Sequence, residues 1–542
     1  MKSHKFSWLG LLVFPAIAAS QTASPGHVNF VPNAASSWDR YFAGTSLSQQ
    51  QWILSHFANM LVYEPFFNSQ TSWYPNAYLY MDLYGIQKGS WEEIFHPEWI
   101  LKDQNGNRLY IPFNCGGGTC GMYAADIANP AFRAAWITEA AGITWAGNYV
   151  GPYIDDVNMD FKVSDGNGNP VAPIDSNTGQ PMTWDAWRNY MVTFLSEFRA
   201  VMPSKKIVEN VVWFANPNGI QDADPAIQHQ IATADKINLE RGVASDSNLT
   251  GGTGFFSVYA FLNYIDRMHA AGKGIILQEN ALDQAGQQYG LASYFLISNG
   301  NDEIGDQTAT PDNWWTGYDV ELGAPLGPRR YNNGIFERDF SGGKVLLGEP
   351  GLSPQTVDLG GTFTTLDGRQ VGAVTLGGAQ GFVLLATGPV APPAGGVTRY
   401  LSDLTPNFVL NGWGTYQKDK SVIGQPLTIS GVTYNKGLGA HAYSELHYPL
   451  SGNCSSFTAT VGIDDEVPVG QGHEAFQVWA DGYLLFDSGF LSSGTPSQPV
   501  TVDLTGRQNL GLVVTDGVYR DGSPGTDWGH GDWGNAAIVC AH

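Results

Sequence analysis

Carboxyl groups at the ends of short apolar runs are the side chains in this sequence best suited to do chemistry. The most informative run is Tyr153-Ile-Asp-Asp-Val157, in which strand alternation places Asp155 on the same side as Tyr153. Cleavage of an acetal needs one carboxyl group that donates a proton and another that acts as nucleophile or activates water. Asp155 is therefore the first catalytic candidate. Asp156 and Asp160 follow on the next loop, where each could instead cap a helix or pair with an arginine.

Glu240 is the preferred second carboxylate, because it ends a later apolar run and directly precedes Arg241. A neighbouring guanidinium group can keep one acid ionised, and such asymmetry separates a catalytic acid from a base. A structural Arg–Glu pair is the alternative. Glu279, in Leu277-Gln-Glu-Asn280, competes for the same role.

Further polar and aromatic residues are candidates for substrate binding. Carboxylates and amides can contact sugar hydroxyl groups, and aromatic rings can stack on the flat faces of sugars. For the lone His and Trp residues in this set, a place in the core or on the surface is the open alternative. The candidates are Glu64, Asp82, His96, Glu209, Asn210, Trp314 and Trp315.

Seven short apolar runs, most of them ending in a polar residue, are typical of buried parallel strands. They cover residues 59–64, 77–82, 151–156, 206–210, 236–240, 274–279 and 293–298. Helices are expected between them over 129–141, 184–202 and 255–271. Repeated units of this kind favour an α/β fold of the (β/α)8 TIM-barrel type, in which the carboxyl ends of all strands meet at one face. No glycine-rich dinucleotide fingerprint follows the first strand, which argues against an open doubly wound sheet.

Changes in composition divide the chain into several domains. The first twenty residues join Lys2 and Lys5 to an apolar run and small residues, which is typical of a secretory signal peptide, and the run is too short for a membrane span. Downstream, strand and turn patterns replace the alternation of strands and helices. We expect a signal peptide over 1–20, the barrel over 21–338, a small β-appendage over 339–388, a Pro/Gly-rich linker over 389–398 and an all-β sandwich over 399–542.

The charge balance restricts the partners of the chain. Its 542 residues include 50 Asp and Glu but only 27 Lys and Arg, for a formal net charge of −23. Polyanions such as nucleic acid need clusters of basic residues, and anionic membranes are disfavoured for the same reason. An anionic uronan, the substrate of a lyase, is a poor partner too. Neutral or cationic substrates remain open. We expect a polysaccharide or glycan as partner, no nucleic acid, no membrane, and a monomer.

The four cysteines are expected to form two disulfides in an exported protein, Cys115 with Cys120 and Cys454 with Cys540. A metal site is the alternative, but neither pair has further ligands at the spacing of such a site. No organic cofactor is expected. The stretch from Asn299 to Asp306 is acidic enough to line the barrel mouth or to offer ligands to a structural calcium ion, although it lacks the spacing of a recognised calcium loop.

Residues 28–385 resemble the hypothetical glycosyl hydrolase family 15. The resemblance rests on Tyr153-Ile-Asp-Asp-Val157 and on the longer stretches His96–Asp103, Ala124–Pro130 and Phe336–Leu347. The Tyr-Ile-Asp-Asp element is also similar to the fourth-strand motif of endo-α-galactosaminidase-type barrels. That similarity implies a catalytic role for Asp155 and a partner glutamate near Glu240, but it transfers no substrate.

Residues 399–542 resemble the NPCBM carbohydrate-binding module, a jelly-roll sandwich. The matching stretches are Tyr434–His441, Val461–Asp464, Val478–Gly482, Leu512–Asp516 and Gly531–Ala536. The family's usual His-Ala-Asp-Trp-Ala-Asp ending reads His530-Gly-Asp-Trp-Gly-Asn535 here, so one acidic side chain is lost at position 535 and with it any calcium or sugar contact that it would make. The candidate sugar-binding residues of this module are Trp413, His441, Asp464, Trp528 and Asp532.

Together these patterns predict a secreted glycoside hydrolase that cleaves O-glycosidic bonds of a polysaccharide or glycoconjugate by paired-carboxylate catalysis. The alternative from another class is a secreted lectin-like protein whose barrel binds sugar without cleaving it.

Overall fold

The computed structural model describes most of residues 24–540. The segments outside the description are 35–37, 212–214, 217–218, 221–223, 281–282, 307–308, 389–396, 451–453, 482, 505–506 and 516–527, together with both ends of the chain. The expected signal peptide lies outside the described residues, as does most of the expected linker.

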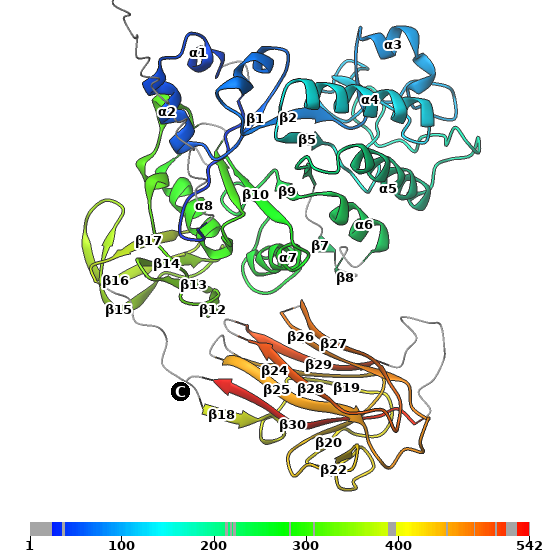
Figure 1. Ribbon diagram of the computed structural model, residues 1–542, viewed down its shortest axis with the longest axis vertical. Helices are drawn as coiled ribbons and strands as arrows, with labels where there is room; N and C mark the ends of the chain where they lie inside the picture. The colour runs from blue at the N-terminus through cyan, green and yellow to red at the C-terminus, as the bar shows by residue number, and fades with distance from the viewer. Residues whose placement is uncertain are drawn as a thin grey trace, which may run out of the picture.

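A parallel sheet of seven strands forms the centre of the N-terminal region (Figure 1). All neighbours in it pair in parallel, and most of its residues are buried, in keeping with the apolar runs seen in the sequence. In spatial order the strands are β1 (Met60–Val62), β2 (Ala77–Asp82), β5 (Gly151–Asp155), β6 (Val208–Asn210), β9 (Lys236–Leu239), β10 (Gly274–Glu279) and β11 (Glu303–Asp306).

The two edge strands of this sheet bind the same segment near the N-terminus. Phe30 forms a parallel bridge to Ile304 of β11, and Asn33 forms one to Leu61 of β1. The amide of Val31 donates to the carbonyl of Ile304 over 2.9 Å, while that of Leu61 donates to Pro32 over 3.0 Å. The region thus contains a strongly curved parallel sheet of the half-barrel kind, with isolated bridges rather than an eighth regular strand between its edges.

Helices cover the outer face of the sheet. Their starts follow from local capping: Asn129 accepts hydrogen bonds from the amides of Ala131 and Phe132, and Pro130 occupies the first helical position. Thr183 caps the next long helix in the same way. The helices are α1 (Asp39–Phe42), α2 (Leu47–His56), α3 (Trp91–Phe95), α4 (Pro130–Ala146), α5 (Trp184–Val201), α6 (Pro225–Thr233), α7 (Val258–Ala270) and α8 (Gln284–Ile297). Short hairpins in the loops are formed by β3 (Gly85–Gln87) with β4 (Met122–Ala124) and β7 (Ala215–Asn216) with β8 (Gly219–Ile220).

One strand prediction is wrong. Residues 293–298 form the end of helix α8 and not a strand, and the seventh strand is β11, within the stretch that was expected to be an acidic loop. Asp283 caps α8 through the amide of Gly286. Residues 289–297 of this helix are all buried, so this part of its sequence is largely apolar and shows no helical period.

A six-stranded antiparallel sheet follows the parallel one and packs on helix α8. The contact is close, because a Cβ atom added to Gly381 would lie 2.7 Å from the Cβ of Ala292. In chain order its strands are β12 (Arg330–Asn332), β13 (Ile335–Phe340), β14 (Gly343–Gly348), β15 (Gln355–Thr365), β16 (Gln370–Leu376) and β17 (Gly381–Ala386).

The C-terminal region is all β and consists mainly of two antiparallel sheets that enclose one core. Trp533 from one sheet packs edge-on against Phe476 from the other, with ring centroids 5.4 Å apart. The first sheet contains β18 (Val397–Tyr400), β20 (Gln417–Lys418), β23 (Gly437–His441), β25 (Cys454–Ile463), β28 (Gln498–Asp503) and β30 (His530–Cys540). The second contains β19 (Phe408–Asn411), β24 (Ser444–Pro449), β26 (Glu474–Ala480), β27 (Tyr483–Leu491) and β29 (Asn509–Thr515), and β21 (Thr428–Ile429) pairs with β22 (Val432–Thr433) beside them.

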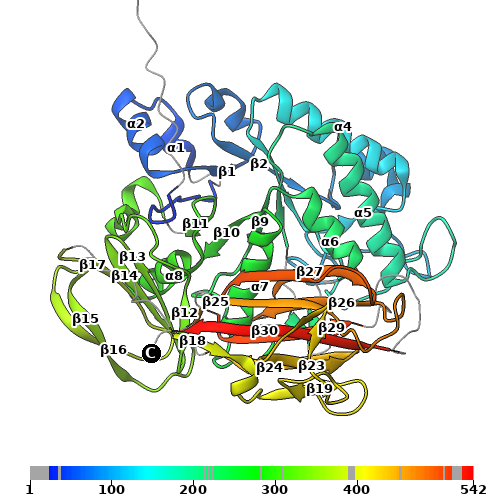
Figure 2. The same ribbon diagram turned by 60° about the horizontal axis from the view of Figure 1, so that its bottom comes forward.

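Both predicted disulfides are present, Cys115–Cys120 and Cys454–Cys540. The second joins the start of β25 to the end of β30, so it ties together the first and last parts of the C-terminal sandwich. Figure 2 brings this sandwich forward, with helix α7 behind it. None of the helices in the described part of the chain has the length and hydropathy that a membrane span requires.

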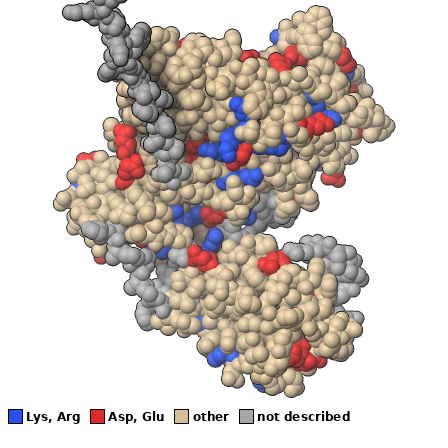
Figure 3. Space-filling model, viewed as in Figure 1, with Lys and Arg blue, Asp and Glu red and all other residues tan. Residues whose placement is uncertain are grey.

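Charged side chains are unevenly distributed over one face of the molecule. On the face drawn in Figure 3, Asp and Glu side chains are scattered, whereas most Lys and Arg side chains gather near the middle of the face, above the C-terminal sandwich.

Candidate active site and sugar-binding surface

A row of polar side chains crosses the inner face of the parallel sheet near the carboxyl ends of its strands. The hydroxyl of Tyr80 donates to Asp155 over 2.7 Å, and the amide side chain of Asn210 donates to the other oxygen of Asp155 over 2.7 Å. Asn238 then donates to Asn210 over 2.8 Å and to Gln278 over 3.3 Å. Five neighbouring strands each contribute one member, so the row joins β2, β5, β6, β9 and β10. Hydrophobic side chains of the same inner face, including Tyr78, Tyr153 and Ile276, pack as a small cluster of their own.

Asp155 is held by three donors. Besides Tyr80 and Asn210, the backbone amide of Asp156 donates to its Oδ1 atom over 2.8 Å. Its side chain is only partly buried, so it remains open to solvent at the mouth of the sheet. A carboxylate fixed in this way has the orientation that a base or nucleophile needs.

Two further acids lie beside Asp155. Burial, followed by the charge of Asp155, raises the pKa of Asp156 to about 6, although Asn158 donates to its carboxylate over 2.9 Å. Asp82 accepts hydrogen bonds from the amides of Tyr84 and Gly85, yet burial and then the charges of Asp156 and Asp155 raise its pKa well above the usual range. Three carboxyl groups so close together cannot all be ionised at low cost, and this situation is common in catalytic sites.

Glu240 lies just beyond the end of β9, two residues after Asn238. Strand alternation therefore gives both side chains the same inner face. Glu240 is exposed, and its charge contributes to the raised pKa of Asp156. The structure thus brings Asp155, Asp156 and Glu240 to one electrostatic neighbourhood. Asp160, in contrast, forms an ion pair with Arg188 at 2.7 Å and is not part of this group.

Glu209 and Glu279 lie on the opposite face of the sheet, against helices. Glu209 is fully buried and accepts a hydrogen bond from Thr233 of α6 over 2.9 Å, and burial raises its pKa to about 8. Burial also raises the pKa of Glu279, to about 7. The two strand ends therefore present Asn210 and Gln278 to the mouth, in place of their glutamate neighbours.

Glu279 holds the loop that follows Glu240. Its Oε2 atom accepts hydrogen bonds from the amides of Ala244 and Ser245, over 3.0 and 3.1 Å. The loop lies so close that a Cβ atom added to Gly242 would be 2.3 Å from the carboxyl carbon of Glu279. Glu279 is thereby a positioning residue for the segment that carries Glu240.

The other predicted substrate contacts are scattered. Glu64 is exposed after β1, where Asn68 donates to it over 3.5 Å. His96 stacks on Trp99 with centroids 3.9 Å apart and lies 2.8 Å from Glu98, in the segment between β3 and β4. The structure therefore does not join either residue to the hydrogen-bonded row.

Trp314 and Trp315 both take part in aromatic packing. Trp314 meets Phe30 and Phe57 edge-on, and its indole NH donates to Asp319 over 2.9 Å. Trp315 packs edge-on against Tyr318, with centroids 4.9 Å apart. Their contacts are those of a structural cluster under helix α2.

The acids of the expected calcium loop have partners within the fold. Asp302 accepts hydrogen bonds from the amides of Ile275 and Asn299, both over 2.9 Å, and lies 2.8 Å from the ring of His269. Glu303 pairs with Lys236 over 2.5 Å. Oxygen atoms engaged in this way do not fit a calcium site. Across the described residues, no group of three or more His, Cys, Asp or Glu side chains is arranged to hold a metal ion.

Several candidates of the C-terminal module gather at one end of its first sheet. Trp413 is 57% exposed, and its ring lies 5.7 Å from that of buried His441 and 6.4 Å from that of His530. Trp528, which is 46% exposed, lies 6.4 Å from His530. His530 in turn is 2.7 Å from Glu466. An exposed indole beside charged and imidazole groups is a suitable surface for a sugar ring.

Asp464 and Asp532 lie beneath this surface. Asp464 accepts hydrogen bonds from the amides of Thr428 and Glu466, over 3.1 and 2.8 Å. Asp532 is fully buried, and burial, followed by the proximity of Asp464, raises its pKa well above the usual range. Both acids therefore contribute to the interior of the module.

Tyr80, Asn238 and Gln278 were missed in the sequence. Each could have been found from strand alternation, which gives residues two positions apart the same face of the sheet. Asn238 precedes Glu240 by two positions, and Gln278 follows inward-facing Ile276 by two. A rule that considers only the last polar residue of each strand selects Glu279 instead.

Comparisons with known proteins agree with this architecture. The NPCBM/NEW2 domain matches residues 397–539. A protein of Renibacterium salmoninarum that carries the provisional name endo-alpha-N-acetylgalactosaminidase is 38% identical over 152 residues, which cover 26% of this chain and 10% of that relative. The chain thus spans only a small part of that protein.

Among solved structures, a CBM51 module from Clostridium perfringens GH95 in complex with methyl-galactose is 35% identical, with a TM-score of 0.24, and covers 26% of this chain and 99% of its own. A noncanonic maltogenic α-amylase from Thermotoga neapolitana is 10% identical, with a TM-score of 0.39, over 66% of this chain and 98% of its own. These TM-scores are too low to define fold or substrate.

The family match in the N-terminal region is broad. The model of hypothetical glycosyl hydrolase family 15 matches residues 58–344, from just before β1 to the start of β14. These residues contain all seven parallel strands and the whole hydrogen-bonded row. The chain therefore belongs to hypothetical glycosyl hydrolase family 15 and carries a match to the NPCBM/NEW2 domain in its C-terminal region.

Proposed function

We propose that this chain is a secreted, monomeric enzyme that hydrolyses O-glycosidic bonds of a polysaccharide or glycoconjugate, with Asp155 and Glu240 as its paired carboxylates. The observation that carries the proposal is the fixed Asp155 carboxylate, held by three donors on the same inner face that leads to Glu240. Strand β6 alone separates β5 from β9, so their backbones lie about 10 Å apart, a span that two acidic side chains can narrow to the separation found in glycosidases.

The proposed scaffold is a closed (β/α)8 barrel over residues 21–338, with a signal peptide before it, a β-appendage over 339–388, a linker over 389–398 and the sugar-binding jelly-roll sandwich over 399–542. The bridges from Phe30 and Asn33 to the two edge strands support closure. In a closed barrel the mouth is ringed by loops from every unit, and these loops would set the choice of sugar.

In the proposed mechanism the two acids differ in role. Asp155 accepts hydrogen bonds only, so it acts as nucleophile or as the base that activates water. Glu240, exposed two strands further along the mouth, donates the proton to the leaving oxygen. Asp156, with a pKa raised to about 6, is a further carboxyl group beside Asp155, and negative charge there stabilises the positive charge that the transition state develops on the sugar ring. The proposed reaction requires no organic cofactor.

The C-terminal module is proposed to hold the glycan through Trp413, His441 and Trp528. Their clustering near His530 and the exposure of both indoles support a sugar platform. Trp413→Ala is expected to weaken retention on an immobilised glycan, whereas hydrolysis of a small aryl glycoside should persist.

Sugar release from a panel of polysaccharides and aryl glycosides, including α-N-acetylgalactosaminides, tests the catalytic proposal. Asp155→Asn and Glu240→Gln should each lower the rate at least about a hundredfold. Asp160→Asn is the matched control, because Asp160 pairs with Arg188 outside the acidic group. Unchanged release by both variants would refute the site, and glycan binding without any release would favour the non-catalytic lectin-like protein.

A further inference from the structure

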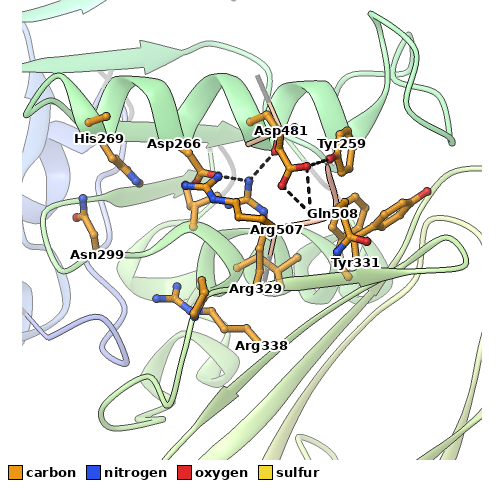
Figure 4. Close-up of a pocket in the computed structure, with 16 residues that line it drawn as sticks. Tyr259, Asp266, His269, Asn299, Arg329, Tyr331, Arg338, Asp481, Arg507 and Gln508 are labelled. Carbon is orange, nitrogen blue, oxygen red and sulfur yellow. Dashed lines mark hydrogen bonds and ion pairs between the residues drawn. The ribbon is translucent and has the colours of Figure 1, made fainter. Parts of the chain in front are cut away.

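A second cavity lies where three parts of the chain meet. It has a volume of about 430 Å³ and is lined by one face of helix α7, the end of α8, the first strands of the six-stranded sheet and two turns of the C-terminal module (Figure 4). Its size is within the range of small-molecule sites. The end of α8 leads into the start of β11, so this cavity is at the opposite end of the parallel sheet from Asp155.

Three arginines from separate segments line this cavity, in a chain that is strongly acidic overall. Arg329 forms two hydrogen bonds to Asp266 of α7, over 2.6 and 2.5 Å, and Arg507 of the module lies 3.4 Å from the same carboxylate. One Asp266 carboxylate therefore serves two guanidinium groups, as Figure 4 shows.

Arg338 is the third arginine, and its partners are carbonyl oxygen atoms. It donates to Phe295 over 2.8 Å, to Ser298 over 2.9 Å and to Gly327 over 3.3 Å, and only 9% of it is exposed. No carboxylate of the described residues lies within ion-pair distance of it. Burial, followed by the charge of nearby Arg329, lowers its pKa to about 10, although the more distant charges of Asp266 and Asp302 act in the opposite direction. A buried cation in such surroundings is stabilised by an anion placed next to it.

The rest of the lining is suited to a sugar ring. Tyr259 and Tyr331 stand at one side with ring centroids 5.2 Å apart. The side chains of Asn263, which accepts a hydrogen bond from Arg329 over 3.2 Å, and of Gln508 also line the cavity. Aromatic faces and amides are the usual partners of sugar C–H faces and hydroxyl groups. Asp481, the other acid of the cavity, accepts hydrogen bonds from the amides of Gln508 and Asn509.

We propose that this cavity binds an acidic monosaccharide unit, with its carboxylate beside Arg338 and its ring between the tyrosines and the module. The site is independent of the catalytic mouth. The Nη2 atom of Arg338 is the proposed donor to this carboxylate, because its Nε and Nη1 atoms already donate to carbonyl oxygen atoms. Hydrogen bonds between two charged groups are stronger than those between neutral groups. The net charge of −23 repels anions at long range, but salt screens that repulsion more than it screens a contact inside the cavity.

Binding at this place would fix the module against the barrel. The cavity is formed by residues of α7, of β13 and of the module, so a ligand would contact all three. A ligand that binds only the assembled form stabilises it by mass action. We therefore expect the module and the N-terminal region to unfold together in its presence.

Calorimetric titration and thermal unfolding of the full chain with galacturonate test the proposal. Galactose has the same ring without the carboxylate, and acetate has the carboxylate without the ring. Galacturonate should bind and raise the unfolding midpoint, whereas the two controls should not at the same concentration. If galactose bound equally well, the proposed role of Arg338 in binding a carboxylate would be wrong. If acetate bound equally well, the proposal that the ligand is a sugar would be wrong.

Two variants locate the site. Arg338→Gln should reduce galacturonate affinity by about tenfold or more, because a charged hydrogen-bond donor is lost. Ala270→Trp places a large side chain at an exposed position of the cavity lining and leaves residue 338 unchanged, and it should abolish binding in a folded protein. Arg369→Gln, on the exposed pair with Asp367, is the matched control. Unchanged affinity in the Ala270→Trp variant would refute this location even if Arg338→Gln failed to fold.

Discussion

The hydroxyl group of Tyr80 donates a hydrogen bond to Oδ2 of Asp155 over 2.7 Å, between neighbouring strands β2 and β5. Because Asn210 occupies the other oxygen, the plane of the carboxyl group is defined from both sides. This relationship gives Asp155 a fixed direction at the mouth of the sheet.

Tyr80→Phe should lower kcat by about tenfold with a smaller change in KM, because the variant loses the orientation of Asp155 and not the bulk of the ring. Steady-state kinetics on the best substrate measure the effect. Tyr190→Phe is the matched control, since Tyr190 donates to Asp175, at 3.2 Å, outside the hydrogen-bonded row. Equal losses in both variants would show that the effect is one of general stability.

Gly242→Ala should impair both folding and catalysis. The added Cβ atom would lie 2.3 Å from the buried carboxyl carbon of Glu279 and would push the Glu240 loop away. We expect a loss of about 1–3 kcal/mol in the free energy of unfolding, as for other overpacked sites, together with reduced kcat. Gly254→Ala is the control, because a Cβ atom there meets no atom within 4 Å. Wild-type kinetics in Gly242→Ala would contradict the positioning role of Glu279.

Glu209 should make stability depend on pH. Its pKa in the folded chain is about 8, against an ordinary value of 4.5, so the folded state retains a proton that the unfolded state loses. Its contribution to stability is complete below pH 4.5, declines as the pH rises towards 8, and is then lost, with a limiting slope of about 1.4 kcal/mol per pH unit. Glu209→Gln should remove this decline in denaturant unfolding between those limits. If the stability of the variant declined with pH in parallel with that of the wild type, Glu209 would not be the source of the decline.

The two disulfides should differ in their effect on stability. Cys454 and Cys540 are 86 residues apart in sequence, whereas Cys115 and Cys120 are 5 apart. A longer closed loop restricts the unfolded chain more. In the chain-entropy account the long loop contributes about 4–5 kcal/mol to the free energy of unfolding and the short loop about 2 kcal/mol. Paired Cys→Ser variants, compared by thermal unfolding, should therefore rank in that order. A larger loss from the short loop would point to local structure around Cys115 instead.

Much of this architecture could be predicted from residue order. Six of seven strands, three long helices and both disulfides follow from apolar runs, from caps such as Asn129–Pro130 and from the pairing of four cysteines. These are local signals, because the burial of a short strand and the start of a helix depend on neighbouring residues. The resemblances to hypothetical glycosyl hydrolase family 15 and to NPCBM were likewise visible in short stretches and agree with the family matches.

The tertiary structure decided which acids share the mouth. The sequence by itself placed Glu209, Glu240 and Glu279 alike at strand ends, but the register of the sheet turns Glu209 and Glu279 towards helices and leaves Asn210 and Gln278 inside. Residues 293–298 became helix because a fully buried helix and a buried strand have the same apolar composition. The arginine cavity depends on contacts between residues more than two hundred positions apart, such as Asp266 and Arg507, and no local pattern records such contacts.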